Sequence, residues 1–324
     1  MSFGAMLCLV LAAVYATTCA LLSIGVALVW NAALERRRPG AGELLTLRLA
    51  PAAGAAFLTL NVALPAFLIH EPYHDTEPVG PLLVMLAVLA LCALGSGMFR
   101  AWRALRAPRA LLRRCRPTDG GPADGGPADR GPAGAQLDIL DDPEPVVAVV
   151  GVWRPRIIAT DRVRAALSDE EFLQVIAHEK AHVAAHDNLK LLLQIIIPDA
   201  LTWMPAGTGL TERWRAAAEL EADARAVGLD QAKRLALASA LLKVARLSTA
   251  TGQRSLALRM AAFDDVSVRV RELLEPVPMP RRRLPLRTLM ACSLLLAVIG
   301  VPLYASLHDC IESLVAFGTG YERW

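Results

Sequence analysis

The sequence predicts a multi-pass α-helical membrane protein with four transmembrane helices and an α+β, mainly helical domain inserted between the third and the fourth. Two observations lead to this fold class. The chain of 324 residues is 55% hydrophobic and has a mean hydropathy of +0.41, so it is more apolar than an ordinary soluble protein. Its apolar residues also gather in windows of roughly 20 residues, the length that crosses a bilayer. We expect these helices at residues 6–30, 49–69, 79–99 and 287–307.

The arginines predict which side of the membrane each loop occupies. They follow the first window, form a dense collar after the third and precede the fourth. The loop between the second and third windows, HEPYHDTEPV, has three acidic residues and no lysine or arginine. Because cytoplasmic loops carry positive charge, we expect both termini outside a plasma membrane and the middle region in the cytoplasm. We interpret the arginines as topology signals that also contact lipid, and expect no direct nucleic-acid partner.

A stretch rich in glycine and proline divides the chain. Residues 117–136 contain GGPAD twice, which is typical of a flexible linker. Residues 1–116 are then expected to hold three spans and the arginine collar. Residues 137–275 form the expected cytoplasmic domain, and residues 276–324 hold the fourth span and a short external tail.

The cytoplasmic domain is predicted to begin with strands and to continue with helices. The β-branched run VVAVVGVW and the run RIIAT after Pro155 predict a small sheet. Ser168 and Glu171 have the spacing of a capping box, so a helix is expected to begin there. The apolar stretch at residues 189–205 is interrupted by Pro198 and by charged residues. It therefore favours a buried or membrane-surface helix over a fifth span.

Half of the six histidines lie in the sequence VIAHEKAHVAAHDN, as His178, His182 and His186. His178 and His182 are one helical turn apart, so their side chains share a face and can meet one Zn²⁺. Glu179, between them, can take a proton from a water at that ion. The other interpretation of this pattern is a solvated helix face, which the apolar flanks of the segment disfavour.

The third ligand is expected from a later helix. His186 lies about 12 Å from His178 along a helix axis, too far to share one ion, and no glycine breaks the helix between them. We expect His186 at the helix end or hydrogen-bonded behind a ligand. Glu219, in the sequence ELEAD, is the predicted third ligand, and Glu221 is the fallback. Asp223 is expected to accept the spare N–H of a ligating histidine.

The segments HEKAHVAAHDN and ELEAD together resemble the gluzincin pattern of membrane-embedded zinc endopeptidases. Two families share it: the prenyl-protein and heat-shock membrane proteases, and the BlaR/MecR-type peptidases of the β-lactam sensor-transducers. The chain is more similar to the second group, in its span order and in GVWRPRI, which resembles the G-x-x-R-P-R-I stretch of that group. The resemblance implies a zincin-like cytoplasmic metallopeptidase domain with one Zn²⁺. It also implies regulatory cleavage of cytoplasmic or membrane-near proteins, with a transcriptional repressor as target and with self-cleavage.

The chain departs from the sensor-transducers after the fourth window. No Ser-x-x-Lys acylation motif follows it, so we expect a peptidase that lacks the C-terminal penicillin-binding sensor domain. The oxyanion stabiliser is expected to be an arginine, a lysine or His186, because residues 137–275 contain no tyrosine, and Arg225 is the named candidate. The strand at residues 146–150 offers an edge to an extended substrate.

Two alternative functions stay open at this level. One is a non-catalytic signalling or scaffold protein that keeps zinc for folding, which Glu179 disfavours because a structural site needs no base. The other is the prenyl-protein or heat-shock type of protease, which the span order disfavours. The sequence leaves open the substrate, the cleavage site, the activating signal and the oligomeric state.

Overall fold

A computed structural model of the chain describes residues 3–30, 39–70, 80–114, 136–141, 144–197, 199–250 and 256–275. These residues divide into two compact units. Among the described residues, the helical unit contains the chain up to Arg100 and the segment Gln194–Glu212, and the sheet unit contains Ala101–Leu193 and residues 213–275. The expected linker, apart from Gln136, and the expected fourth span at 287–307 lie outside the described residues.

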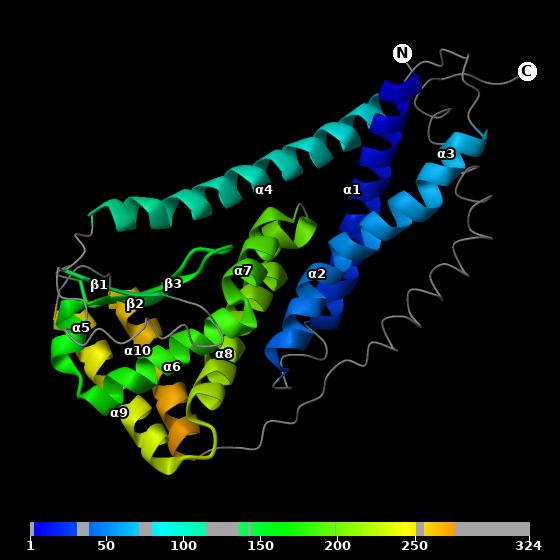
Figure 1. Cartoon of the computed structure of the whole chain (residues 1–324). Coiled ribbons are helices and arrows are strands. Elements are labelled where there is room, and N and C mark those ends of the chain that lie inside the picture. The colour runs from blue at the N-terminus through cyan, green and yellow to red at the C-terminus, as the bar shows by residue number, and fades with distance from the viewer. Residues whose placement is uncertain are drawn as a thin grey trace, which may run out of the picture. The chain divides into compact units, whose positions relative to one another are not determined.

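The helical unit has three helices that are long and apolar enough to cross a membrane, at Phe3–Leu28, Ala41–Leu68 and Pro81–Arg106. The first is α1 (Phe3–Val29) and the third lies in α4 (Pro81–Arg114) (Figure 1). The second joins α2 (Ala41–Leu58), a π-helical turn η2 (Thr59–Ala63) and α3 (Leu64–His70). These helices confirm the three N-terminal windows as candidate spans.

The second of these helices begins at Ala41, well before the predicted start at residue 49. Arg48 therefore lies inside this helix, where it is only 3% exposed and forms an ion pair with the buried carboxylate of Asp199. Arg48 Nη2 also lies 3.2 Å from Thr202 Oγ1. A prediction from hydropathy ends a span at an arginine, because burying an unpaired charge costs free energy. The ion pair with Asp199 offsets part of this cost, so Arg48 can lie inside the helix.

Asp199 belongs to the apolar stretch for which a buried or membrane-surface helix was expected. This stretch is broken into α7 (Asp187–Ile196), a short 3₁₀ turn η3 (Ala200–Trp203) and the start of α8 (Pro205–Val227). Leu201 is fully buried in this stretch, and Leu210 is fully buried just after it. Within the described residues it forms no helix long and apolar enough to be a fifth span, and Gln194–Glu212 packs in the helical unit.

A close approach between α4 and the end of α7 makes Gly97 sensitive to substitution. A Cβ atom at Gly97 would lie 2.3 Å from the carbonyl oxygen of Ile196, whereas one at Gly95 would meet nothing within 4 Å. We expect Gly97→Ala to cost about 1–3 kcal/mol, as overpacking does. Gly95→Ala on the same helix is the control and should be neutral or slightly stabilising. Thermal unfolding of the detergent-purified variants measures the difference, and equal midpoints would contradict this packing.

The sheet unit contains three strands, β1 (Gln136–Leu140), β2 (Val147–Val150) and β3 (Arg156–Thr160), in the order β1-β3-β2. β1 runs parallel and β2 antiparallel to the central β3. The expected small sheet is therefore confirmed. The turn from β2 to β3 requires Gly151, because its φ is +96° and a Cβ atom there would lie 2.9 Å from the carbonyl oxygen of Arg154.

Helices α5 (Asp161–Ala166), α6 (Asp169–Ala185), α9 (Gln231–Ala250) and α10 (Leu256–Leu274) complete this unit (Figure 1). Its core joins Ile157 of β3, Phe172 and Ile176 of α6, Leu237 of α9 and Leu273 of α10. The apolar face of α6 therefore packs inside the unit.

The predicted capping box opens α6. The Ser168 side chain accepts from the backbone N–H of Glu171, and the Glu171 carboxylate accepts from the backbone N–H of Ser168 at 2.8 Å. The same carboxylate accepts from Ser239 Oγ at 2.6 Å and from Lys243 Nζ at 2.7 Å, both on α9. The cap thus also fixes the histidine-bearing helix against α9.

Candidate metal centre

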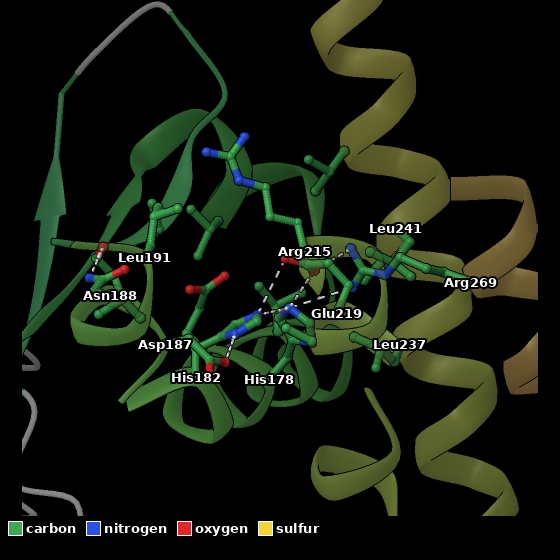
Figure 2. A pocket seen from close by; sticks show the side chains of 18 of the residues that line it. His178, His182, Asp187, Asn188, Leu191, Arg215, Glu219, Leu237, Leu241 and Arg269 are labelled. Carbon is green, nitrogen blue, oxygen red and sulfur yellow. Dashed lines mark hydrogen bonds and ion pairs between the residues drawn. The ribbon is translucent and has the colours of Figure 1, made fainter. Parts of the chain in front are cut away.

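His178 and His182 on α6 and Glu219 on α8 converge on one point (Figure 2). The two Nε2 atoms are 3.1 Å apart, and Glu219 oxygens lie 3.3 Å from His178 Nε2 and 3.5 Å from His182 Nε2. Two ligands of a tetrahedral ion with bonds of about 2.0–2.1 Å are roughly 3.3 Å apart. The three side chains could therefore hold a metal ion without rearrangement of the backbone.

Both histidines turn their other ring nitrogen to a carboxylate. His178 Nδ1 lies 2.8 Å from Asp223 Oδ1, and His182 Nδ1 lies 2.8 Å from Asp187 Oδ2. A carboxylate behind a ligating histidine fixes its tautomer and makes Nε2 a better ligand. Asp223 occupies the place expected for it, while Asp187 was not identified from the sequence.

Asp187 reaches His182 because α6 ends between them. His186 caps the helix with a left-handed backbone (φ 57°, ψ 39°), and its N–H bonds back to His182 and Val183 carbonyls. In a continuous helix a residue five positions after His182 would point to another face. The left-handed residue redirects the chain, so Asp187 folds back onto His182. His186 itself is exposed at the helix end, which is one of the two places expected for it.

Arg269 of α10 completes the charge balance of the centre. Its guanidinium bonds both oxygens of Asp223, at 2.7 and 2.8 Å, and lies 2.9 Å from Glu219 Oε2. Arg269 was not predicted from the sequence, because 46 positions separate it from Asp223. One signal was available: Arg269 lies one helical turn before the core residue Leu273, so a charged residue falls on an apolar face.

Glu179 lines a cavity of about 450 Å³ beside the two histidines. The edge strand β2 forms one wall of this cavity, and Leu237, Leu241 and Val244 of α9 contribute to another. Burial raises the pKa of Glu179 above its ordinary value, against the opposing effect of the two histidines. A carboxylate that holds a proton more readily at a metal centre is suited to general base chemistry.

The predicted Arg225 does not reach this cavity. It donates to Glu221 Oε2 at 2.8 Å and to the carbonyl of Ala181 at 3.3 Å. That pairing also occupies Glu221, the fallback ligand. Arg215 lines the cavity instead and is labelled in Figure 2. Its guanidinium forms no hydrogen bond or ion pair within the described part of the chain.

The comparison with known protein families agrees with this geometry. Residues 139–273 match the family model of the BlaR1 peptidase M56. This part of the chain is therefore similar to the M56 peptidases, which is consistent with the resemblance to the BlaR/MecR-type family. The match includes His178, His182, Glu219 and Arg269. The three helices that are long and apolar enough to cross a membrane are consistent with a membrane protein. No curated protein matches the chain significantly.

His182 predicts opposite effects of pH on the stability of the metal-free chain and on the affinity of the chain for a metal ion. Burial lowers the pKa of His182, but its acceptors Asp187 and Glu219 outweigh this and raise it to about 9. A folded-state pKa above the unfolded value of about 6.5 means that the protonated ring stabilises the fold below pH 6.5. This stabilisation is lost as the pH rises through about 9. A metal ion needs the neutral ring, so its affinity should rise over the same range.

Unfolding midpoints of the metal-free chain at a series of pH values, and zinc titrations at the same values, measure the two trends. His186→Asn removes an exposed histidine that is no metal ligand, keeps a residue that tolerates the left-handed backbone, and should leave both pH dependences unchanged. His182→Gln should weaken the pH dependence of the unfolding midpoint of the metal-free chain. A metal-free midpoint that rises between pH 6.5 and 9 would contradict this account of His182.

Proposed function

We propose that the chain is a membrane-anchored zinc metalloendopeptidase that hydrolyses peptide bonds of cytoplasmic or membrane-near proteins. The observation that carries this proposal is the tetrahedral spacing of His178, His182 and Glu219 with Glu179 beside them in a cavity. Three protein ligands leave one position for water or substrate, as in catalytic zinc sites, whereas structural sites use four. The M56 match supports the same reaction class.

The residues of the chain have distinct roles in the proposed reaction. His178, His182 and Glu219 hold the ion, while Asp223 and Asp187 keep the two rings oriented. When bound, zinc would polarise the scissile carbonyl and lower the pKa of the attacking water. Glu179 takes the proton of this water and passes it to the leaving amine.

Substrate binding is proposed along β2, the strand at the edge of the sheet. Its residues line the cavity that contains Glu179, so an extended peptide added to this edge would pass the metal centre. Arg215 is the proposed stabiliser of the negative oxygen that develops on the carbonyl, in place of Arg225. It lines the cavity and has no competing partner within the described residues.

The biological role is proposed from the resemblance. The proposed topology has both termini outside the plasma membrane and residues 137–275 in the cytoplasm, with the arginine collar that precedes them in contact with lipid. A transcriptional repressor is the proposed type of target, with self-cleavage as an accompanying event. A non-catalytic zinc scaffold is the alternative from another class, and a prenyl-protein or heat-shock type protease is the alternative within peptidases.

The test compares cellular N-terminal peptides from cells with the native chain and cells with Glu179→Gln. New cytoplasmic N-termini that appear only with the native chain would identify both the activity and its substrate. Identical peptide sets, from cells in which the native chain binds zinc, would favour the scaffold.

A further inference from the structure

The hydrogen bonds of β2 define which of its backbone groups are free to receive a substrate. The N–H of Thr160 donates to the carbonyl of Val146 at 3.0 Å, and the register pairs Val147 with Ala159. In an antiparallel pair such bonds alternate. Val146, Ala148 and Val150 therefore direct their backbone groups toward β3, and Val147, Val149 and Gly151 direct theirs to the outer edge.

Asn188 occupies part of this outer edge. Its Nδ2 donates to the carbonyl of Val149 at 3.1 Å and to the carbonyl of Gly151 at 2.9 Å. An amide that bonds two successive outward carbonyls takes the place of a neighbouring strand. Within the described residues, three outward groups of β2 remain without a hydrogen-bond partner: the N–H and the carbonyl of Val147, and the N–H of Val149.

Asn188 also separates two cavities. The first, about 450 Å³, contains Glu179, and the second, about 420 Å³, lies against the β2–β3 turn and is lined by Trp153 and His186. Val149 and Asn188 line both. The side chain thus stands where an extended peptide on β2 would pass from one cavity to the other.

Asn188 directly follows Asp187, which holds the ring of His182. The left-handed residue His186 therefore sends two neighbouring side chains to two different partners, one to a metal-facing histidine and one to the edge strand. Asn188 contacts the outer edge of β2 and Asp187 contacts His182. Because the two residues are adjacent in the chain, the position of this edge is coupled to the position of the metal centre.

We infer that Asn188 is a positioning residue that ends the substrate-binding edge at Val149 and so selects which peptide bond faces Glu179. This inference rests on the proposed peptidase function. An added strand forms at most three backbone hydrogen bonds with β2, to Val147 and to the N–H of Val149. Without Asn188 the strand could also bond the Val149 carbonyl and slide by two residues, the shift that keeps each side chain on its own face.

The test maps the bonds that the zinc-loaded full chain in detergent cleaves in a defined set of synthetic peptides, by mass spectrometry. In Asn188→Ala we expect the ratio of cleavage at the main bond to cleavage two residues away to fall about 3- to 10-fold, the factor of one net hydrogen bond. Asn188→Ser keeps one hydrogen-bond donor and should give an intermediate ratio. If Asn188→Ala folds poorly, the cleavage ratio of Asn188→Ser still tests the inference. Lys190→Ala removes a 2.9 Å bond to Asp187 without touching β2 and should keep the native ratio.

Cleavage of the same bonds in native proportions by Asn188→Ala or Asn188→Ser would overturn the inference and reduce Asn188 to an anchor of the β2–β3 turn. The inference would also be overturned if Lys190→Ala changed the cleavage ratio as much as Asn188→Ala does, because the effect would then act through Asp187 and not through β2. A native chain that binds zinc but cleaves no peptide would overturn the proposed function, and this inference with it.

Discussion

Replacing Glu179 by Gln is expected to lower peptide turnover by about 10²–10⁴-fold, the usual contribution of a general base, while the metal stays bound. The amide keeps the size of the side chain but cannot accept the proton of the attacking water. His178, His182 and Glu219, which converge on the ion, are untouched. Turnover of a cleaved peptide and metal content per chain, measured on the same preparation, separate the two effects.

Glu170→Gln is the matched control. It makes the same chemical change on the same helix, at an exposed residue whose carboxylate accepts only from Ser168 Oγ among the contacts described, at 3.0 Å. It should retain native turnover. If Glu179→Gln retains native turnover as well, Glu179 is not the base. If it loses the metal, its loss of turnover says nothing about proton transfer, and Glu179 has instead a structural part in the centre.

Replacing Arg269 by Leu is expected to destabilise the metal-free chain by about 3–5 kcal/mol, the cost of removing one partner from a buried ion pair. Arg269 holds Asp223 through two hydrogen bonds and Glu219 through a third contact. Its loss leaves two carboxylates facing each other with only the histidines as counter-charges. Denaturant unfolding of the metal-free chain measures the loss.

Added zinc should recover part of this stability, because a divalent cation replaces the missing positive charge and binds only the folded state. Arg271→Leu is the control, since Arg271 is exposed on the same helix and surface substitutions usually change stability by less than about 0.5 kcal/mol. Combining Arg269→Leu with Asp223→Asn should restore some stability by removing the stranded charge. Equal unfolding free energies for the two arginine variants would contradict the structural role of Arg269.

Local sequence patterns predicted the parts of this protein that depend on neighbours along the chain. The spacing of His178 and His182 places two imidazoles together in any α-helix, because side chains four positions apart share a face. Ser168 and Glu171 form their capping box for the same reason. The three N-terminal spans follow from apolar length alone, since a bilayer needs about 20 such residues.

The features that the sequence predicted wrongly all depend on contacts between residues far apart in the chain, which local spacing does not predict. The second helix begins before the predicted residue 49, and Arg48 inside it pairs with Asp199, which is 151 positions away. Arg225 and Arg215 lie on the same helix, and only the packing of α8 decides that Arg215 lines the cavity. Each outcome depends on which faces meet in space, and the helical period alone gives no information on that.

Three apolar helices of membrane-crossing length and two histidines on one helical face follow from the sequence, because apolar length and helical spacing are local properties. The surroundings of those histidines follow from tertiary packing. A single left-handed residue, His186, brings Asp187 to His182 and Asn188 to β2. The packing of α10 brings Arg269 to Asp223 and Glu219. The physical reason is that buried charges need partners, and folding can supply those partners from any part of the chain.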